Sequence, residues 1–199
     1  LSTIRAFEEQ FGLKNAVAPC YGLAEATLAV SIWPRGEPIR LDSYGRFISV
    51  GRPCQGVSIK ITDEGAELPA GREGEILVKS PGVMQGYYGN PEATRRVLTP
   101  DGWLRTGDLG FVDREEYLYI TGRIKDVIIV GGENIGPADI EELVDQVPGI
   151  RYSGAVGVDS ERLGTQRLYV VAEVRDPGSD HETLSHLTRE IVQRVREGR

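Results

Sequence analysis

The chain has 199 residues, of which 40% are hydrophobic and 27% charged, and its net charge is −7 at pH 7. This length allows one large domain or two small ones, and the composition is typical of soluble globular proteins. The acidic balance, without any offsetting run of Lys and Arg, argues against a general nucleic-acid binder but leaves room for a local basic site for one phosphate. No apolar run approaches the roughly 20 residues that span a membrane, and two cysteines without metal-ligand spacing favour reduced thiols in a cytoplasmic protein.

The first half of the chain predicts a helix followed by many short strands. Because the chain starts with Leu1 inside a helical pattern, we expect it to be part of a longer protein. Residues 15–20 are expected to form a strand that leads into a helix at YGLAEATLAVS. Between residues 49 and 119, short strands separated by turns predict a small barrel or sandwich.

The pattern changes after Gly122. Residues 127–130 are all apolar, which predicts a strand buried on both faces, and Gly131 and Gly132 predict a turn with positive φ. A helix opened by Pro137, strands at about 153–159 and 167–175, and a last helix complete a compact α+β unit. Ser179 and Glu182 are expected to form the capping box of that last helix.

The motif YGLAEAT, residues 21–27, lies where a strand is expected to give way to a helix. Backbone N–H groups and the helix dipole at such a place attract anions. Tyr21 could stack on a base and Glu25 could coordinate Mg²⁺. The alternative is a core tyrosine with a solvated glutamate at a helix N-terminus.

The motif WLRTGDLG, residues 103–110, places Asp108 between two glycines. A carboxylate can accept hydrogen bonds from both hydroxyls of a ribose, although an Asp in a strand-ending turn is an equally simple explanation. Arg123 offers a planar set of donors for ribose or phosphate, and its alternative is a surface pair with Asp126. Tyr87 and Tyr88 are expected to serve packing.

The motifs YGLAEAT, GYYGNPEAT, WLRTGDLG and GRIKDVIIVGGENIGPADIEE occur in this order, and together they resemble the adenylate-forming superfamily of acyl-CoA synthetases, luciferases and nonribosomal adenylation domains. The resemblance covers nearly the whole chain. It implies a mixed α/β and α+β fold, in which residues 1–122 are the later part of a large N-terminal domain. A small β-barrel would occupy about 47–122, and residues 123–199 would be a mobile C-terminal domain that stops before the family's catalytic lysine.

The resemblance also implies a role for each matching residue. Tyr21 and Gly22 would bind the adenine of ATP or AMP, and Glu25 would be the catalytic acid that holds Mg²⁺. Asp108 would hold the ribose hydroxyls, and Arg123 would lie beside them.

Three further residues match the part of the family pattern that serves the second half-reaction. Lys125 would be the hinge about which the C-terminal domain rotates. Gly131 and Gly132 would lie in the loop that swings toward the thiol-accepting tunnel.

The implied reaction has two steps. A carboxylic acid, expected to be a fatty acid, attacks the α-phosphate of ATP and releases pyrophosphate with Mg²⁺; a thiol of CoA or of a phosphopantetheinyl carrier protein then attacks the acyl-adenylate. YGLAEATLAVS is similar to fatty acyl-AMP ligases, whereas GGENIGPADIEE is similar to acyl-CoA ligases, so both acceptors stay open. Ala24 departs from the threonine that the family often has there, which removes one hydroxyl contact.

No segment of the chain matches the family's phosphate loop or its C-terminal catalytic lysine. We therefore expect this polypeptide by itself not to adenylate a substrate. A second hypothesis is a nucleotide- or carrier-protein-binding module that keeps the fold without the activity, and a third is an unrelated α+β protein with chance motifs.

Overall fold

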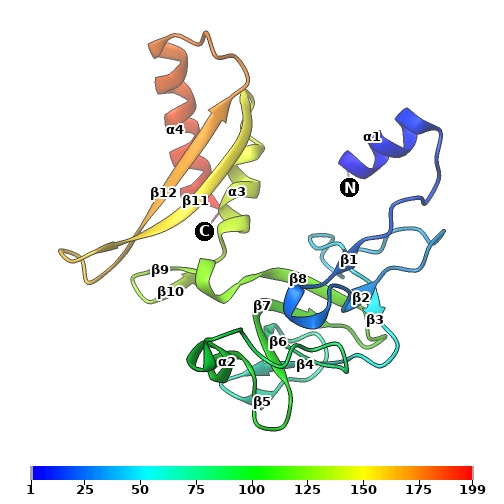
Figure 1. The fold of residues 1–199 in the computed structure, drawn as a ribbon. Helices are drawn as coiled ribbons and strands as arrows, with labels where there is room; N and C mark the ends of the chain where they lie inside the picture. The colour runs from blue at the N-terminus through cyan, green and yellow to red at the C-terminus, as the bar shows by residue number, and fades with distance from the viewer. Residues whose placement is uncertain (1, 199) are drawn as a thin grey trace. The chain divides into compact units, whose positions relative to one another are not determined.

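The computed structural model describes residues 2–198, which group into two compact units that divide between Ile124 and Lys125 (Figure 1). Each unit has its own hydrophobic core. Helices and strands occur in both units, which confirms the predicted mixed class. Within residues 2–198, no helix combines the length and the apolar character needed to cross a membrane.

The first unit contains mostly strands, with two α-helices and a short 3-10 helix. Its elements are α1 (Ser2–Phe11), β1 (Cys20–Tyr21), η1 (Ala24–Ala26), β2 (Ser31–Ile32), β3 (Arg52–Pro53), β4 (Ser58–Asp63), β5 (Ala66–Glu67), β6 (Gly74–Lys79), α2 (Pro91–Val97), β7 (Leu104–Val112) and β8 (Leu118–Arg123). A second 3-10 helix, η2 (Ile124–Asp126), spans the division between the units.

An antiparallel five-stranded sheet in the order β5-β4-β6-β7-β8 forms the centre of the first unit. Five of the six residues of the central strand β6 are buried, in keeping with its apolar sequence. The described strands form an open sheet, in which the edge strand β5 has only two residues and pairs with β4 alone, so the small barrel expected at about 47–122 stays a prediction. The other edge, β8, is instead covered by residues 49–51, since Leu118 bonds through both backbone groups to Val50 and Gly51.

The prediction of a helix after Tyr21 is wrong, because the chain reverses direction there. Only the single 3-10 turn η1 forms, after which Thr27 and Leu28 adopt φ values of 54° and 79°. The chain then returns as β2, which pairs antiparallel with β1. A Cβ on Gly22 would lie 1.3 Å from the carbonyl oxygen of Leu28, so the absence of a side chain at this glycine permits the close return.

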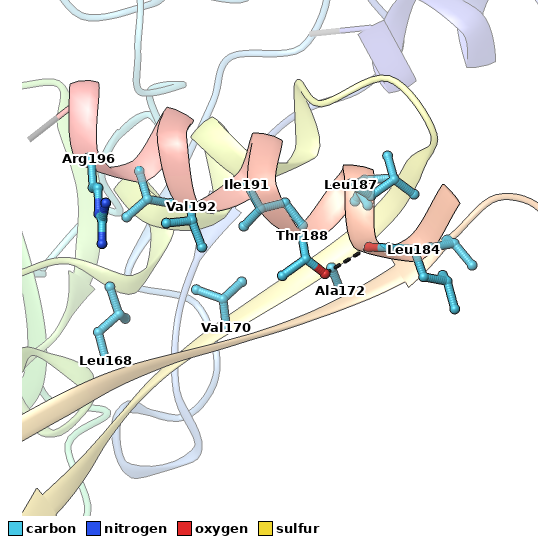
Figure 2. A pocket seen from close by; sticks show the side chains of 12 residues that line it. Leu168, Val170, Ala172, Leu184, Leu187, Thr188, Ile191, Val192 and Arg196 are labelled. Atoms are coloured by element: carbon cyan, nitrogen blue, oxygen red, sulfur yellow. Dashed lines mark hydrogen bonds between the residues drawn. The ribbon is translucent and has the colours of Figure 1, made fainter. Parts of the chain in front are cut away.

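The second unit contains the predicted strands and helices in their predicted order, with one unpredicted strand, β10, added after β9. Its elements are β9 (Ile128–Val130), β10 (Glu133–Ile135), α3 (Pro137–Asp145), β11 (Ile150–Ser160), β12 (Thr165–Val174) and α4 (His181–Glu197). Helices α3 and α4 pack on one face of the long β11–β12 hairpin, where their apolar residues share one core with those of β12 (Figure 1). Figure 2 shows Leu168, Val170 and Ala172 of β12 facing the apolar side of α4 across a pocket.

Two further details of the second unit differ from expectation. Strand β9 is not buried on both faces, because it belongs to a two-stranded hairpin: Ile128 is 1% exposed, whereas Ile129 is 47% exposed. Helix α4 is capped by Asp180, whose carboxylate accepts the Thr183 N–H, and not by Ser179. The Ser179 hydroxyl instead donates to the carbonyl of Asp176, so the helix begins one residue later than the capping box predicts.

Candidate functional site

Asp108 is the centre of a cluster that joins three residues distant in sequence. Its side chain is 7% exposed. The Tyr21 hydroxyl donates to Asp108 Oδ2 at 2.6 Å, and Arg123 Nε donates to Oδ1 at 2.6 Å. Asp108 and Arg123 are paired residues of β7 and β8, so the sheet register itself sets their separation. The structure thus brings together the aromatic, acidic and basic residues that the motifs predict.

The backbone around Asp108 is held by residues that the sequence did not single out. Thr106 Oγ1 donates to the carbonyl of Ile76 at 2.7 Å and accepts the Asp108 N–H at 3.0 Å. Gly107 adopts φ 73°, a conformation that favours glycine, and its N–H points to the carboxylate of Glu75. The sequence TGD carries this arrangement, but the partner residues on β6 are about thirty positions away.

Tyr21 is a neutral donor to a buried carboxylate. Burial raises the pKa of its phenol above the ordinary value, and the hydrogen bond to Asp108 raises it further. The phenol therefore keeps its proton at neutral pH. Asp108 is consequently held by one neutral hydroxyl and one guanidinium, which supply donors to a desolvated carboxylate.

Glu25 lies in the η1 turn and is fixed by a segment some 60 residues later in the chain. The Tyr87 hydroxyl donates to Glu25 Oε1 at 2.8 Å, and the Met84 N–H donates to the Glu25 carbonyl at 2.7 Å. Thr27 Oγ1 adds a bond of 2.5 Å to the carbonyl of Gly82. Among residues 2–198, the hydrogen bond that the Glu25 carboxylate accepts comes from Tyr87.

The expectation that Tyr87 and Tyr88 serve packing is wrong. Tyr88 is fully exposed, and Tyr87 is 38% exposed while its hydroxyl contacts Glu25. The loop that presents Tyr87 is held by Thr94, whose hydroxyl accepts the Tyr87 N–H and donates to the Asn90 carbonyl. No local spacing in the sequence connects Tyr87 with Glu25, so only the fold could identify this pair.

The remaining candidate residues belong to the second unit. Lys125 is exposed within η2. Gly131 and Gly132 form the turn between β9 and β10, with φ values of 62° and 88°, which confirms the predicted positive-φ turn. This turn is a feature of the second unit alone, whereas the Asp108 cluster and the Glu25–Tyr87 pair belong to the first.

Comparison with known proteins agrees with these motifs. A family model described as AMP-binding enzyme matches residues 1–88. The sulfoacetate–CoA ligase of Cupriavidus necator is 39% identical over 189 residues, which cover 94% of this chain and 36% of the relative. The fatty acid–[acyl-carrier-protein] ligase ScoC of Streptomyces coeruleorubidus is 44% identical over 158 residues, or 78% of this chain and 30% of the relative. The chain spans about a third of the length of the curated relatives it matches.

Solved structures of other proteins also resemble this chain. ATP-bound MatB from Rhodopseudomonas palustris superposes with a TM-score of 0.72 and 35% identity over 87% of this chain and 33% of that one. O-succinylbenzoate coenzyme A synthetase from Bacillus subtilis, in complex with ATP and magnesium ion, gives a TM-score of 0.70 and 31% identity over 92% of this chain and 36% of that one. With its four ordered motifs, its family match and these neighbours, the chain belongs to the adenylate-forming superfamily of AMP-binding enzymes.

Proposed function

We propose that this chain is part of an ATP-dependent ligase that activates a carboxylic acid as an acyl-adenylate and passes the acyl group to a thiol. The observation that carries the proposal is the Asp108 cluster, in which Tyr21 and Arg123 hold a buried carboxylate. The names of the relatives, which include CoA ligases and a carrier-protein ligase, support the reaction class.

In this proposal the Asp108 carboxylate receives the two ribose hydroxyls of the nucleotide. A carboxylate has about four acceptor positions, and Tyr21 and Arg123 occupy two of them. The two protein donors orient the carboxylate before the nucleotide arrives. Such preorganisation aligns the α-phosphate with the attacking carboxylate, which is the main catalytic requirement of a phosphoryl-type displacement.

The site fits a magnesium ion that is held mostly by the nucleotide. Within residues 2–198, no group of three or more His, Cys, Asp or Glu side chains could hold a metal ion. Mg²⁺ commonly takes only one or two protein carboxylates together with phosphate oxygens and water. Glu25, with one oxygen bonded to Tyr87, would supply that carboxylate, and the bound ion would neutralise charge on the leaving pyrophosphate.

We further propose that the acid is apolar, of the fatty-acid type, and that the acceptor is CoA or a carrier-protein thiol. The similarity of YGLAEATLAVS to fatty acyl-AMP ligases and the 44% identity to ScoC support a fatty acid. The 39% identity to a sulfoacetate–CoA ligase supports CoA. Lys125 would be the hinge and the Gly131–Gly132 turn would approach the acceptor in the second step.

Binding of AMP to the Asp108→Ala variant of the intact protein tests the site. Loss of the ribose contact should weaken AMP binding by about 1–3 kcal/mol, or roughly 5- to 150-fold, in calorimetric titration. Asp63→Ala, which removes an exposed acid at the end of β4, is the matched control and should bind AMP normally. Equal AMP affinity of the Asp108→Ala variant and the wild-type protein would overturn the assignment.

The substrate and the acceptor are tested with pyrophosphate exchange and a competition assay on the intact protein. A panel of carboxylic acids from short polar to long apolar should give ATP–pyrophosphate exchange that increases with apolar chain length. CoA and a phosphopantetheinylated carrier protein, offered together, then compete for the acyl group. Exchange with none of the acids would refute the ligase proposal and favour the inactive binding module.

A further inference from the structure

The Gly131–Gly132 turn is held by side chains from a distant part of the second unit. Thr165 Oγ1 accepts the Gly131 N–H at 2.8 Å and donates to the Ile129 carbonyl at 2.9 Å. Gln166 Oε1 accepts the Ile129 N–H at 2.8 Å. Two neighbouring side chains of β12 therefore bond three backbone groups of the β9 strand and of the turn that follows it.

The Gln166 side chain is oriented at both ends. Its Nε2 donates to Asp159 Oδ1 at 3.1 Å on the neighbouring strand β11, while its Oε1 faces Ile129. The bond to Asp159 favours the amide orientation in which the oxygen faces the Ile129 N–H. Thr165 and Gln166 lie next to the end of the β11–β12 hairpin, where Asp159 and Gln166 are paired residues.

The fold reserves space for this side chain. A Cβ on Gly157 would lie 2.4 Å from Gln166 Oε1 and 2.9 Å from a methyl group of Ile128. The backbone of Gly157 carries no positive φ that would itself require glycine. The space beside Gly157 therefore admits the Gln166 amide only because residue 157 has no side chain.

The held turn lines a pocket within the second unit. Gly131 and Gly132 line it together with Leu163 and Gly164 of the β11–β12 turn and with Thr165 of β12. Two consecutive glycines have wide conformational freedom in a chain that is not held. The hydrogen bonds of Thr165 and Gln166 reduce that freedom at the entrance to the turn.

We propose that Thr165 and Gln166 are positioning residues that hold the Gly131–Gly132 turn in the conformation required for acyl transfer to the thiol. This inference rests on the proposed function, in which the thiol sulfur attacks the acyl carbon, AMP leaves and the thiol proton passes to solvent. Neither side chain takes part in that bond exchange. Their effect is on the alignment of the turn, and misplacement by about 1 Å can slow a reaction by roughly 100-fold.

The first test replaces Thr165 by valine in the intact protein. Valine keeps the shape of threonine but removes the bonds to Gly131 and Ile129. Amide hydrogen exchange at Gly131, followed by NMR, should become about five- to tenfold faster, as expected for one lost hydrogen bond. Thr165→Ser keeps the hydroxyl and is the matched control, with protection close to that of the wild-type protein.

The second test compares the two half-reactions of the same variants. Thr165→Val and Gln166→Leu should slow thioester formation by about tenfold or more and leave ATP–pyrophosphate exchange within about twofold. Gly157→Ala, which displaces Gln166 without changing any hydrogen-bonding side chain, should reproduce the loss. Gly154→Ala on the same strand, where a Cβ meets nothing within 4 Å, is its control.

The outcomes separate the inference from the proposed function. Unchanged amide hydrogen exchange at Gly131 in Thr165→Val would show that Thr165 does not hold the glycine turn. If hydrogen exchange at Gly131 becomes faster but the two half-reactions are unaffected or are slowed equally, the proposed role of Thr165 and Gln166 in acyl transfer would be overturned. Absence of any adenylate from the wild-type protein would overturn the proposed function and the transfer role together, while the hydrogen-exchange result would still decide whether Thr165 holds the turn.

Discussion

Asp108 is a nearly inaccessible carboxylate, and such a group is stable in a protein only when donors reach it. Arg123 supplies a charged donor from the partly exposed end of β8, and Tyr21 supplies a neutral one from β1. The same two donors orient the carboxylate for the proposed ribose contact. The structural role of Asp108 therefore coincides with its proposed role in binding, and its variants need a stability measurement beside the binding one.

Tyr21→Phe should destabilise the intact protein at neutral pH. It leaves Asp108 Oδ2 without its phenol donor, and a buried acceptor left unpaired costs about 1–3 kcal/mol. Urea denaturation of the wild-type protein and the variant measures the difference. Equal free energies of unfolding would show that solvent replaces the phenol.

The same pair of proteins should also differ in alkaline solution. Because the folded-state pKa of Tyr21 is raised, its contribution is complete below the unfolded pKa of about 10 and is lost as the pH rises toward the folded value. Above about pH 10 the wild-type free energy of unfolding should fall more steeply than that of Tyr21→Phe, by up to about 1.4 kcal/mol per pH unit. Parallel curves would contradict the raised pKa.

Tyr87→Phe should change the Mg²⁺ dependence of ATP binding more than it changes the free energy of unfolding. The phenol is partly exposed, so its loss should change the free energy of unfolding by no more than about 0.5 kcal/mol. Without the bond to Glu25, the carboxylate is less well oriented, and the Mg²⁺ concentration for half-maximal ATP binding should rise about three- to tenfold in calorimetry. Tyr88→Phe, a change in a fully exposed neighbour, is the control; equal Mg²⁺ dependence in both variants would remove the positioning role of Tyr87.

At the scale of elements, local pattern and tertiary contacts compete around residue 24. YGLAEATLAVS has helix-forming residues, yet the chain makes one 3-10 turn and returns as β2. The return is held by the bond from Val30 N–H to the Tyr21 carbonyl and by the contact of Gly22 with the Leu28 backbone. Strand β2 pairs with β1 on one side and with β3 on the other. This pairing outweighs helix propensity, which is a weak preference over so few residues.

Asp180→Ala should destabilise helix α4 at neutral pH and lower the Tm by a few degrees, since the cap hydrogen bond to the Thr183 N–H is lost. That hydrogen bond lowers the pKa of the Asp180 carboxyl. Its contribution is therefore present above the unfolded pKa and is lost as the pH falls through the folded value. Thermal melts should converge in acid, and Ser179→Ala should show the smaller change; the reverse order would restore Ser179 as the cap.

At the scale of the whole molecule, two separate cores make independent movement of the units physically possible. One core is built on the five-stranded sheet and the other on the β11–β12 hairpin with α3 and α4. The division between Ile124 and Lys125 falls inside the short helix η2. A short element between two cores is where a change in backbone torsion disturbs the least packing.

Lys125→Pro should slow thioester formation more than adenylation, on the order of tenfold more, because proline restricts φ at residue 125 and disfavours helical torsions at Ile124. Lys125→Ala removes the charge but leaves φ unrestricted, and it should spare both steps to within about threefold. Single-turnover measurement of each half-reaction in the intact protein provides the test. Equal loss of both steps in Lys125→Pro would refute the hinge assignment.

Much of the second unit could be predicted because its signals are local. Pro137, the apolar spacing of the next helix and the Gly131–Gly132 pair each specify a structure within a few residues. The cap of α4 was misplaced by one residue because Ser179 and Asp180 are both good caps, and only the geometry of the preceding turn decides between them.

The sequence by itself determined the family, the mixed fold class and the identity of Tyr21, Asp108 and Arg123 as candidates, since ordered motifs are properties of the chain alone. Only the tertiary structure decided which donors meet Asp108, that Tyr87 holds Glu25, and that Thr165 and Gln166 hold the glycine turn. These contacts join residues between 15 and 87 positions apart. Strand register and loop closure create them, and neither is encoded by spacing along the chain.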